Sequence, residues 1–463
     1  MTDLKFLSRT FLSAICSEIW CRRFSDMRLD AEKIYTGAIR ANLPENCVRE
    51  GLSRFSLPFG KLIVVAVGKA AWKMAECAER IITDELGGKI DAGIVITKYS
   101  HSEGDIPGFE IYEAAHPVPD EAGILATERV LALTDRLSAD DSILFLVSGG
   151  GSALFESPYC SLSELSEITE ALLGSGADIK EINAVRKRLS KVKGGRFAEH
   201  AAPASIFTVA LSDVIGNKLD VIASGPTVAD SSTTAEVEEI VSKYSLPVTE
   251  NIRRVMLCET PKVLTNESHF IGGSVSELCL AAKREAEALG YKAEILTDSE
   301  IGEARFVGAR LARLALDKCD TDTPLAYIIG GETVVHLKGN GRGGRNQEIA
   351  LASAAIIAGK ENIAVFSVGS DGTDGPTDAA GGYVDGESYL KMTRAGLNPL
   401  RMLDDNDSYN ALDSVGGLIK TGPTGTNVND ISVALVRVAA PCVPDSKRKF
   451  ANLERVLNYG VEN

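Results

Sequence analysis

Short apolar runs that end in small polar residues constrain the fold of this chain more than any other sequence feature. Four such runs lie at residues 62–67, 143–147, 206–211 and 363–368. Each is too short for a typical buried helix and continuous enough for a strand that is buried on both faces. Helical spacing of apolar residues fills most of the stretches between them. The pattern therefore predicts an α/β fold, in which ligands bind at the carboxyl ends of the strands.

The chain is long for a single hydrophobic core. With 463 residues, we expect two domains. The alternation of strands and helices restarts after a run of helices with little specific patterning, so we place the first domain at 27–245 and the second at 246–440. Residues 1–26 mix aromatic, basic and acidic side chains without a recognisable motif and are interpreted as an N-terminal extension, and residues 441–463 as a C-terminal tail.

Composition and charge argue against several classes of protein. Hydrophobic residues make up 44% and charged residues 24% of the chain, as in ordinary globular proteins. The formal net charge of −15 repels polyanions, so we expect neither nucleic acid nor a membrane as a partner. The nine cysteines form no CxxC pair, which indicates free thiols in a reducing cytoplasm. The five histidines lack metal-ligand spacing, which argues against a zinc site.

A basic, glycine-rich stretch at 330–348 follows a predicted strand at 325–329 and leads into a predicted helix. Its closely spaced glycines permit a compact loop, and Lys338, Arg342 and Arg345 supply three cations with few acids nearby. Such a loop suits the anionic oxygens of phosphate or carboxylate. Asn346 is expected to cap the helix. The alternative is a solvated basic hairpin loop. The candidate ligand-binding residues in this stretch are Glu332, Arg342, Arg345 and Asn346.

Candidate residues of the first domain follow its predicted strands. A lysine comes directly after strand 62–67, and three consecutive glycines follow strand 143–147, where converging N–H groups can hold an anion. Neither GxGxxG nor GxxxxGK[ST] is present, which argues against a nicotinamide Rossmann site and a Walker A loop. The alternatives are a solvated lysine and a tight turn without ligand. The candidates are Lys69, Ser148, Gly149, Gly150, Gly151, Ser152, Asn183, Arg186, Ser212 and Asp213. His116, in a stiff turn, is interpreted as a packed residue.

Three aspartates among glycines follow the strand at 363–368. Asp371, Asp374 and Asp378 are hard oxygen ligands that suit Mg²⁺, or they orient a hydroxyl nucleophile. An ordinary Asp/Gly turn is the alternative. Because the basic loop lies only about twenty residues earlier in the chain, acidic and basic loops that converge on one cleft would suit phosphoryl transfer.

Taken together, the motifs resemble those of the glycerate 2-kinases that carry a C-terminal MOFRL domain. The resemblance rests on VAVGKAAWKMA from residue 65, HPVPDEAG from 116, LVSGGGSALFESP from 146, INAVRKRLSKVKGGR from 182, LSDVIGNKLDVIASGPT from 211, GGETVVHLKGNGRGGRNQE from 330 and SVGSDGTDGPTDAAGG from 367. These blocks span most of residues 30–440. The resemblance implies a Rossmann-like, three-layer first domain that faces a smaller α/β domain, with the MOFRL region at about 325–436.

The resemblance also implies an activity. The expected reaction is ATP-dependent phosphorylation of D-glycerate at its 2-hydroxyl, with Mg²⁺, to give 2-phosphoglycerate and ADP. The lysine of the VGKA motif and an arginine of GRGGRNQE are functionally important in that family, which points to Lys69 and Arg345 as catalytic residues beside Asp371 and Asp374. We expect the two cations to neutralise the glycerate carboxylate or the transferred phosphoryl group, with little contribution to fold stability.

The sequence is also compatible with two other functions. Some relatives are named hydroxypyruvate reductases, which would use NAD(P)H on a similar three-carbon acid, although the missing GxGxxG fingerprint argues against this activity. A non-catalytic binding module for an acidic metabolite is the other, although simple anion capture has no need for the aspartates. The general base and the oligomeric state, with a homodimer as one option, are not fixed by the sequence.

The first prediction concerns the extension at 1–26. Because regular helical patterning starts at Met27 and no motif precedes it, we expect a chain that starts at Met27 to fold and to keep its activity. Thermal unfolding and turnover of the shortened chain, measured beside the full chain, test this expectation. A large loss of either would show that residues 1–26 pack on the rest of the protein.

Overall fold

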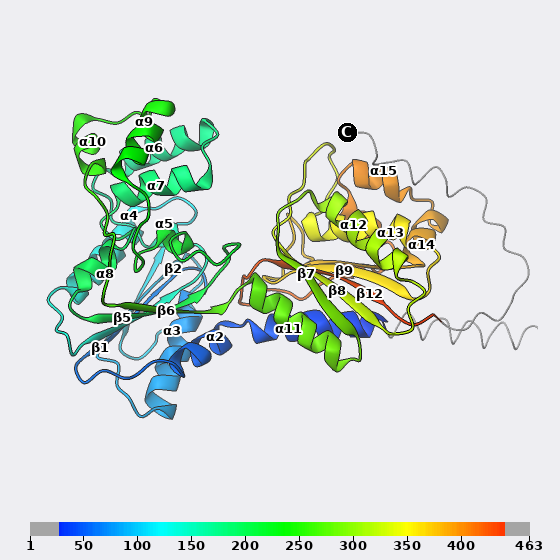
Figure 1. The fold of residues 1–463 in the computed structure, drawn as a ribbon, viewed down its shortest axis with the longest axis horizontal. Helices are drawn as coiled ribbons and strands as arrows, with labels where there is room; N and C mark the ends of the chain where they lie inside the picture. The colour runs from blue at the N-terminus through cyan, green and yellow to red at the C-terminus, as the bar shows by residue number, and fades with distance from the viewer. Residues whose placement is uncertain (1–26, 440–463) are drawn as a thin grey trace, which may run out of the picture.

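The computed structural model describes residues 27–439, which form two lobes that are each built on a six-stranded sheet (Figure 1). The extension at 1–26 and the whole predicted tail at 441–463 lie outside the described residues. None of the helices in residues 27–439 has both the length and the apolar composition that a membrane span requires.

The first sheet is entirely parallel, with the strand order β3-β2-β1-β4-β5-β6. Alternate residues of its central strands face opposite sides, and both sets are buried in hydrophobic cores. This order is that of a doubly wound Rossmann fold, which changes direction between β1 and β4. The predicted α/β class and Rossmann-like first domain are thus confirmed. Its strands are β1 (Leu62–Val67), β2 (Ala92–Lys98), β3 (Phe109–Ala114), β4 (Ser142–Val147), β5 (Ser205–Leu211) and β6 (Glu267–Gly273).

Helices cover both faces of this sheet, and four more form a cap above it with a hydrophobic core of its own (Figure 1). The cap consists of α6 (Leu162–Gly174), α7 (Ile179–Leu189), α9 (Thr234–Lys243) and α10 (Glu250–Met256). The other helices are α2 (Pro44–Leu52), α3 (Ala71–Arg80) with the π-turn η1 (Ile81–Glu85), α4 (Glu121–Thr134), α5 (Gly151–Leu154), α8 (Arg196–Ala201) and the 3₁₀ turn η2 (Ile222–Ser224).

The second sheet is mixed, with the order β11-β10-β9-β12-β8-β7, and only β7 and β8 pair in parallel. Its strands are β7 (Lys292–Glu300), β8 (Leu325–Gly331), β9 (Ile363–Gly369), β10 (Gly381–Asp385), β11 (Leu418–Ile419) and β12 (Asp430–Val436). Its helices are α11 (Val275–Ala288), α12 (Ala304–Asp317), α13 (Arg345–Ile356), α14 (Ser388–Arg394), α15 (Pro399–Asp404) and α16 (Ser408–Asp413). The smaller α/β second domain is also confirmed.

Two segments lie in a different lobe from the one that we predicted. β6 pairs with β5, so the structure moves the boundary predicted at 245/246 to the far side of β6. As an edge strand, β6 is only partly buried and therefore lacks the continuous apolar run that marks the central strands. The helical residues 27–41 pack on the second lobe instead of the first: Arg28 donates a 2.9 Å hydrogen bond to the Leu418 carbonyl, and the Tyr35 ring packs edge-on against Phe366.

Candidate active site

Two loops at the carboxyl edge of the first sheet are locked together. The backbone N–H of Lys69 donates to the Gly149 carbonyl at 2.9 Å, and that of Ala70 donates to Ser148 Oγ at 3.0 Å. Gly68 has φ +120°, and a Cβ there would lie 2.3 Å from Ser148 Oγ. Only glycine therefore permits this contact. The sheet order thus brings together Lys69 and the loop 148–152, as ligand binding at a topological switch point requires.

Three ionisable side chains surround this glycine loop. A Cβ on Gly149 would lie 2.3 Å from Asp213 Oδ2, and one on Gly150 would lie 3.1 Å from the His116 ring and 3.3 Å from Lys69 Cγ. Burial raises the pKa of Asp213 and lowers that of His116, and the charge of nearby Lys69 lowers both pKa values. His116, interpreted from the sequence as a packed residue, therefore borders the site. Its motif, HPVPDEAG, was the signal that could have placed it there.

Asn183 and Arg186, on helix α7, also reach the glycine loop. Ser152 Oγ shares a 3.0 Å hydrogen bond with Ser224 Oγ, which donates to Asn183 Oδ1 at 3.4 Å. Arg186 donates through Nη2 to the Ser152 carbonyl at 3.3 Å, while its buried Nε has no hydrogen-bond partner. An unpaired, buried guanidinium donor is costly, so this position suits an anionic ligand.

Ser212 has a structural contact instead of a free hydroxyl. It is only 1% exposed, and its Oγ accepts a 3.1 Å hydrogen bond from the Val214 N–H. It therefore shapes the turn that presents Asp213, and the structure does not place its side chain toward a ligand as we predicted.

Arg345 is the cation that the second lobe contributes, as Lys69 is that of the first lobe. It donates to both carboxylate oxygens of Asp430, from Nε at 2.5 Å and from Nη2 at 3.2 Å, and from Nη1 to Glu332 at 3.0 Å. Asp430 is buried, which raises its pKa, and the neighbouring Arg345 opposes that shift. The same carboxylates hold the pKa of Arg345 above its usual value, against the effect of burial. Asp430 was missed from the sequence because it stands alone at the start of a strand.

The two groups face each other across the lobes. Asn429 Nδ2 donates a 2.9 Å hydrogen bond to the Asp213 carbonyl. The charge of Glu332 also contributes to the raised pKa of Asp213. The loop that carries Asp213 therefore meets the second lobe at Asn429, the residue before Asp430, and Lys69 and the glycine loop lie on the first-lobe side of this junction.

Asp374, and not Asn346, caps helix α13. Its Oδ1 accepts from the Asn346 N–H at 3.1 Å and its Oδ2 from the Gln347 N–H at 2.8 Å. Asn346 is the second residue of the helix and is buried, with its side chain turned toward Ser367. The prediction that Asn346 caps the helix is therefore wrong, because a carboxylate from another loop supplies the acceptor. That Asn346 contacts the ligand stays a prediction. Burial raises the pKa of Asp374 to about 7.

The three predicted metal-ligand aspartates do not form one site. Both Asp374 oxygens accept hydrogen bonds from the helix, Asp371 accepts from the Thr373 N–H at 2.9 Å, and Asp378 binds Tyr409 and Lys420 on the surface. Within residues 27–439, no group of three or more acidic, histidine or cysteine side chains is placed to hold a metal ion. The three aspartates therefore do not form the magnesium site that we predicted.

The basic and acidic loops nevertheless line one cavity of about 630 Å³. Glycines of the basic loop and Arg345 form one side, and Asp371, Asp374 and Pro376 form the other. Arg342 is the exception: its guanidinium lies over the Tyr409 ring at 4.3 Å and donates to the Pro376 carbonyl at 3.4 Å. The predicted convergence of the two loops is present, without Arg342 as a free cation.

Known proteins share this architecture over nearly the whole chain. Two family models match, the "Domain of unknown function (DUF4147)" at 30–257 and the MOFRL family at 325–430. The D-glycerate 2-kinase of Thermotoga maritima is 51% identical over 412 residues, which cover 88% of this chain and 97% of that protein. A putative hydroxypyruvate reductase of Agrobacterium vitis is 39% identical over 419 residues, 87% of this chain and 93% of that one. The crystal structure of glycerate kinase from Thermotoga maritima matches with a TM-score of 0.86 at 49% identity, covering 89% of this chain and 100% of that one.

Fold and relatives together define a two-domain α/β protein of the kinase class, with a cationic side chain of each domain near the junction of the two. The chain belongs to the glycerate kinase family.

The buried cap of α13 gives a prediction about stability and pH. The pKa of Asp374 is about 7 in the folded protein, against 3.8 for an ordinary aspartate, so the folded state binds more protons between about pH 4 and 7. Its contribution to stability is full below pH 4 and is lost as pH rises through 7. Asp374→Asn removes this dependence. The stability advantage of wild type over Asp374→Asn, measured by urea unfolding, should therefore shrink between pH 5 and pH 8.

Asp371→Asn is the matched control, because its carboxylate accepts a hydrogen bond within an open turn. Any change of stability with pH that the Asp371→Asn variant shares with wild type comes from other groups of the protein. If the advantage over Asp374→Asn instead grows with pH, the helix N–H groups keep Asp374 ionised and the assignment is wrong.

Proposed function

We propose that the protein transfers the γ-phosphoryl group of ATP to the 2-hydroxyl of D-glycerate, giving 2-phosphoglycerate and ADP. The observation that carries this proposal is the junction of the two lobes at Asp213 and Asn429, which has Lys69 and the glycine loop on one side and Asp430, the partner of Arg345, on the other. Both substrates are anions, and each can meet a cation from a different lobe. The name of the 51% identical relative, D-glycerate 2-kinase, supports the same reaction.

The cationic residues of the two lobes would bind different anionic groups of the substrates. Phosphoryl transfer depends mainly on positioning and on neutralising the charge of the transferred group, and the loop 148–152 with Lys69 and Arg186 can supply both. Arg345, whose guanidinium plane is fixed by Asp430, is suited to a paired contact with the glycerate carboxylate.

Asp213 is the carboxylate best suited to accept the proton of the glycerate hydroxyl. Among the described residues, its carboxylate has no hydrogen bond or ion pair to another side chain, and burial raises its pKa. A raised pKa makes a carboxylate a stronger base at neutral pH. It lies against Gly149, where the phosphoryl group would be held.

The side chains at the predicted magnesium site do not fit a protein-bound ion, so we assign no step to the metal. We propose that Mg²⁺ enters with ATP, because this ion usually retains waters and substrate phosphates as ligands.

The six described cysteines are free thiols, which supports a reducing, cytoplasmic setting.

A single pair of assays tests the activity. The protein is incubated with ATP, Mg²⁺ and D-glycerate while ADP release is followed, and a parallel cuvette contains NADH and hydroxypyruvate. We expect ADP only in the first and no NADH oxidation in the second, since no GxGxxG turn follows β1. Oxidation of NADH without ADP release would show a reductase, and binding of D-glycerate without either reaction would show a binding module.

Substitution of the two cations tests their roles. Lys69 Nζ makes no ion pair within the described residues, so Lys69→Ala should leave the melting temperature unchanged. Losing this charge in the site should lower kcat/KM by roughly 100- to several thousand-fold. A Lys69→Ala variant that turns over within a few-fold of wild type would place the site elsewhere.

Arg345 needs a different design, because the structure overturns the expectation that it contributes little to stability. Arg345→Ala leaves buried Asp430 without its counter-charge, which should cost on the order of 2–3 kcal/mol of unfolding free energy. Arg345→Lys keeps the charge but loses the planar fork. We expect it to stay folded in thermal melts while the KM for glycerate rises and kcat falls. Near-normal kinetics in Arg345→Lys would show that Arg345 only steers the substrate.

A further inference from the structure

The first lobe contains a large cavity of its own, apart from the one that the basic and acidic loops line in the second lobe. It has a volume of about 940 Å³ and lies between α7, α9 and the loop 214–221 that follows Asp213. Ala184, Val214, Ile215 and Ile240 give it an apolar part, and half of its lining residues are charged, with acidic and basic side chains mixed. Pockets of this size that combine apolar surface with polar groups are typical small-molecule sites.

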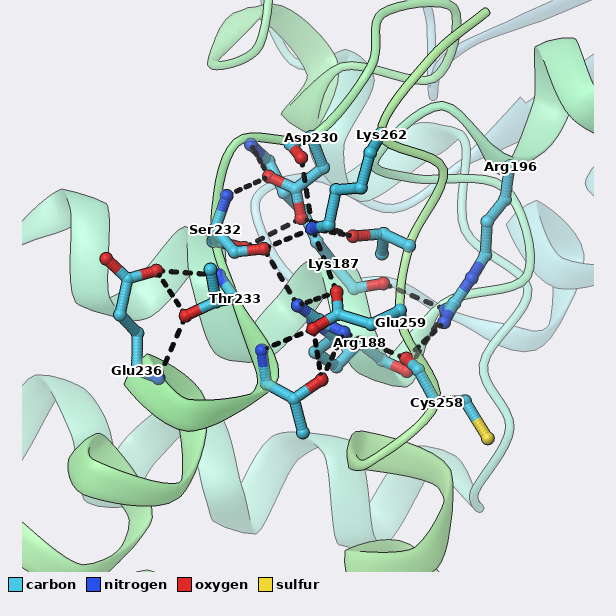
Figure 2. Close-up of polar contacts among 12 residues, drawn as sticks. Lys187, Arg188, Arg196, Asp230, Ser232, Thr233, Glu236, Cys258, Glu259 and Lys262 are labelled. Carbon is cyan, nitrogen blue, oxygen red and sulfur yellow. Dashed lines mark hydrogen bonds and ion pairs between the residues drawn. The ribbon is translucent and has the colours of Figure 1, made fainter.

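The outer wall of this cavity is held in place by ion pairs and hydrogen bonds. Figure 2 shows how the segment that carries Asp230 and Ser232 is tied to α7. Lys187 Nζ donates to Asp230 Oδ1 at 3.1 Å, and Arg188 Nη2 donates to the Ser232 carbonyl at 2.8 Å. Lys262 adds a 3.1 Å bond to the Asp230 carbonyl. These bonds hold the wall in place. Because the paired charges largely neutralise one another, this wall favours neither an anionic nor a cationic ligand.

The cavity is connected to the glycine loop by two hydrogen bonds. Asn183 lines the cavity and accepts from Ser224 Oγ, which in turn bonds to Ser152 Oγ of the loop. Val214 lines it directly after Asp213. At the loop itself, Arg186 keeps one buried N–H without a partner. A ligand with an anionic end at the loop and an apolar, hydrogen-bonding end in the cavity would satisfy both places.

Two cations at the cavity also lack partners among residues 27–439. The ammonium groups of Lys180 and Lys218 line it and make no hydrogen bond or ion pair there, unlike Lys187, which is paired with Asp230. They place positive charge in a lining that also carries acidic side chains. A three-carbon acid is far too small to fill this space and fits better beside Arg345.

We propose that this cavity binds the nucleoside of the phosphoryl donor, with its phosphate chain running to the loop 148–152 and Arg186. The proposal rests on the proposed kinase activity and names the site of one of its two substrates. The base would lie between the apolar walls, and Asp220 would accept hydrogen bonds from ribose hydroxyls. Glycerate would then approach from the second lobe, beside Arg345, so that the hydroxyl and the γ-phosphoryl group meet in the cleft between the lobes.

Calorimetric titration of the full chain tests the assignment with two probes. ADP carries the nucleoside and tripolyphosphate does not. Ala229→Trp places a large ring in the cavity, and we expect it to weaken ADP binding at least about tenfold while tripolyphosphate stays within about twofold. Arg186→Ala should weaken both probes. Ala235→Trp, on the exposed start of α9 and outside the cavity lining, is the matched control and should change neither.

Ile215→Trp fills the same cavity from the opposite wall and gives an independent reading if Ala229→Trp melts at a lower temperature. Unchanged ADP affinity in both filled variants would overturn the cavity assignment. Equal weakening of ADP and tripolyphosphate by both would also overturn it, since a nucleoside site must spare the probe that lacks one. Release of ADP from ATP and glycerate by the wild-type protein distinguishes these outcomes from failure of the kinase proposal itself.

Discussion

Two buried carboxylates at the start of helix α13 set the conditions for the whole cleft. Asp374 accepts hydrogen bonds from two N–H groups at the start of the helix, and Asp430 is paired with the side chain of the first helical residue, Arg345. Leaving either carboxylate unpaired in the interior would cost several kcal/mol. The helix start, the loop after β9 and the start of β12 are therefore fixed to one another. The position of Arg345 in the cleft is a consequence of this charge balance.

The first lobe fixes its half of the cleft by close packing instead of charge. Gly68, Gly149 and Gly151 each lie so near a neighbour that a Cβ would overlap it, against Ser148, Asp213 and Ala223 respectively. A side chain at any of these positions would push the loops apart. The glycine loop is therefore held by shape together with hydrogen bonds to Ser148 and Gly149, and the Lys69 ammonium makes no ion pair within the described residues. The two lobes thus hold the glycine loop and the Arg345 side chain in fixed positions.

Much of this arrangement could be predicted from the sequence, for a physical reason. Strands buried on both faces must be apolar throughout, so β1, β4, β5 and β9 were visible as continuous runs, and the rules for parallel sheets place the residues after them at one edge. What could not be predicted depends on partners distant in the chain. β6 is a half-exposed edge strand, and Asp430 is a single residue whose importance comes only from its contact with Arg345. The aspartates after β9 do not form a metal site, because Asp374 instead accepts a hydrogen bond from the start of helix α13. The sequence does not show that the loop and the helix start are in contact.

The contacts of Arg345 also suggest how an anionic substrate enters a cleft that already contains three carboxylates. Asp430 is buried and held through two bonds, whereas the Glu332 side chain is 48% exposed and held through one. Displacing Glu332 therefore costs less, because water can solvate its carboxylate once it leaves. A substrate carboxylate can take the Nη1 position while Asp430 keeps the guanidinium plane in place. Of the contacts that Arg345 makes, the one to Glu332 is therefore the easier to exchange for another anion, and the one to Asp430 is the contact that fixes the side chain.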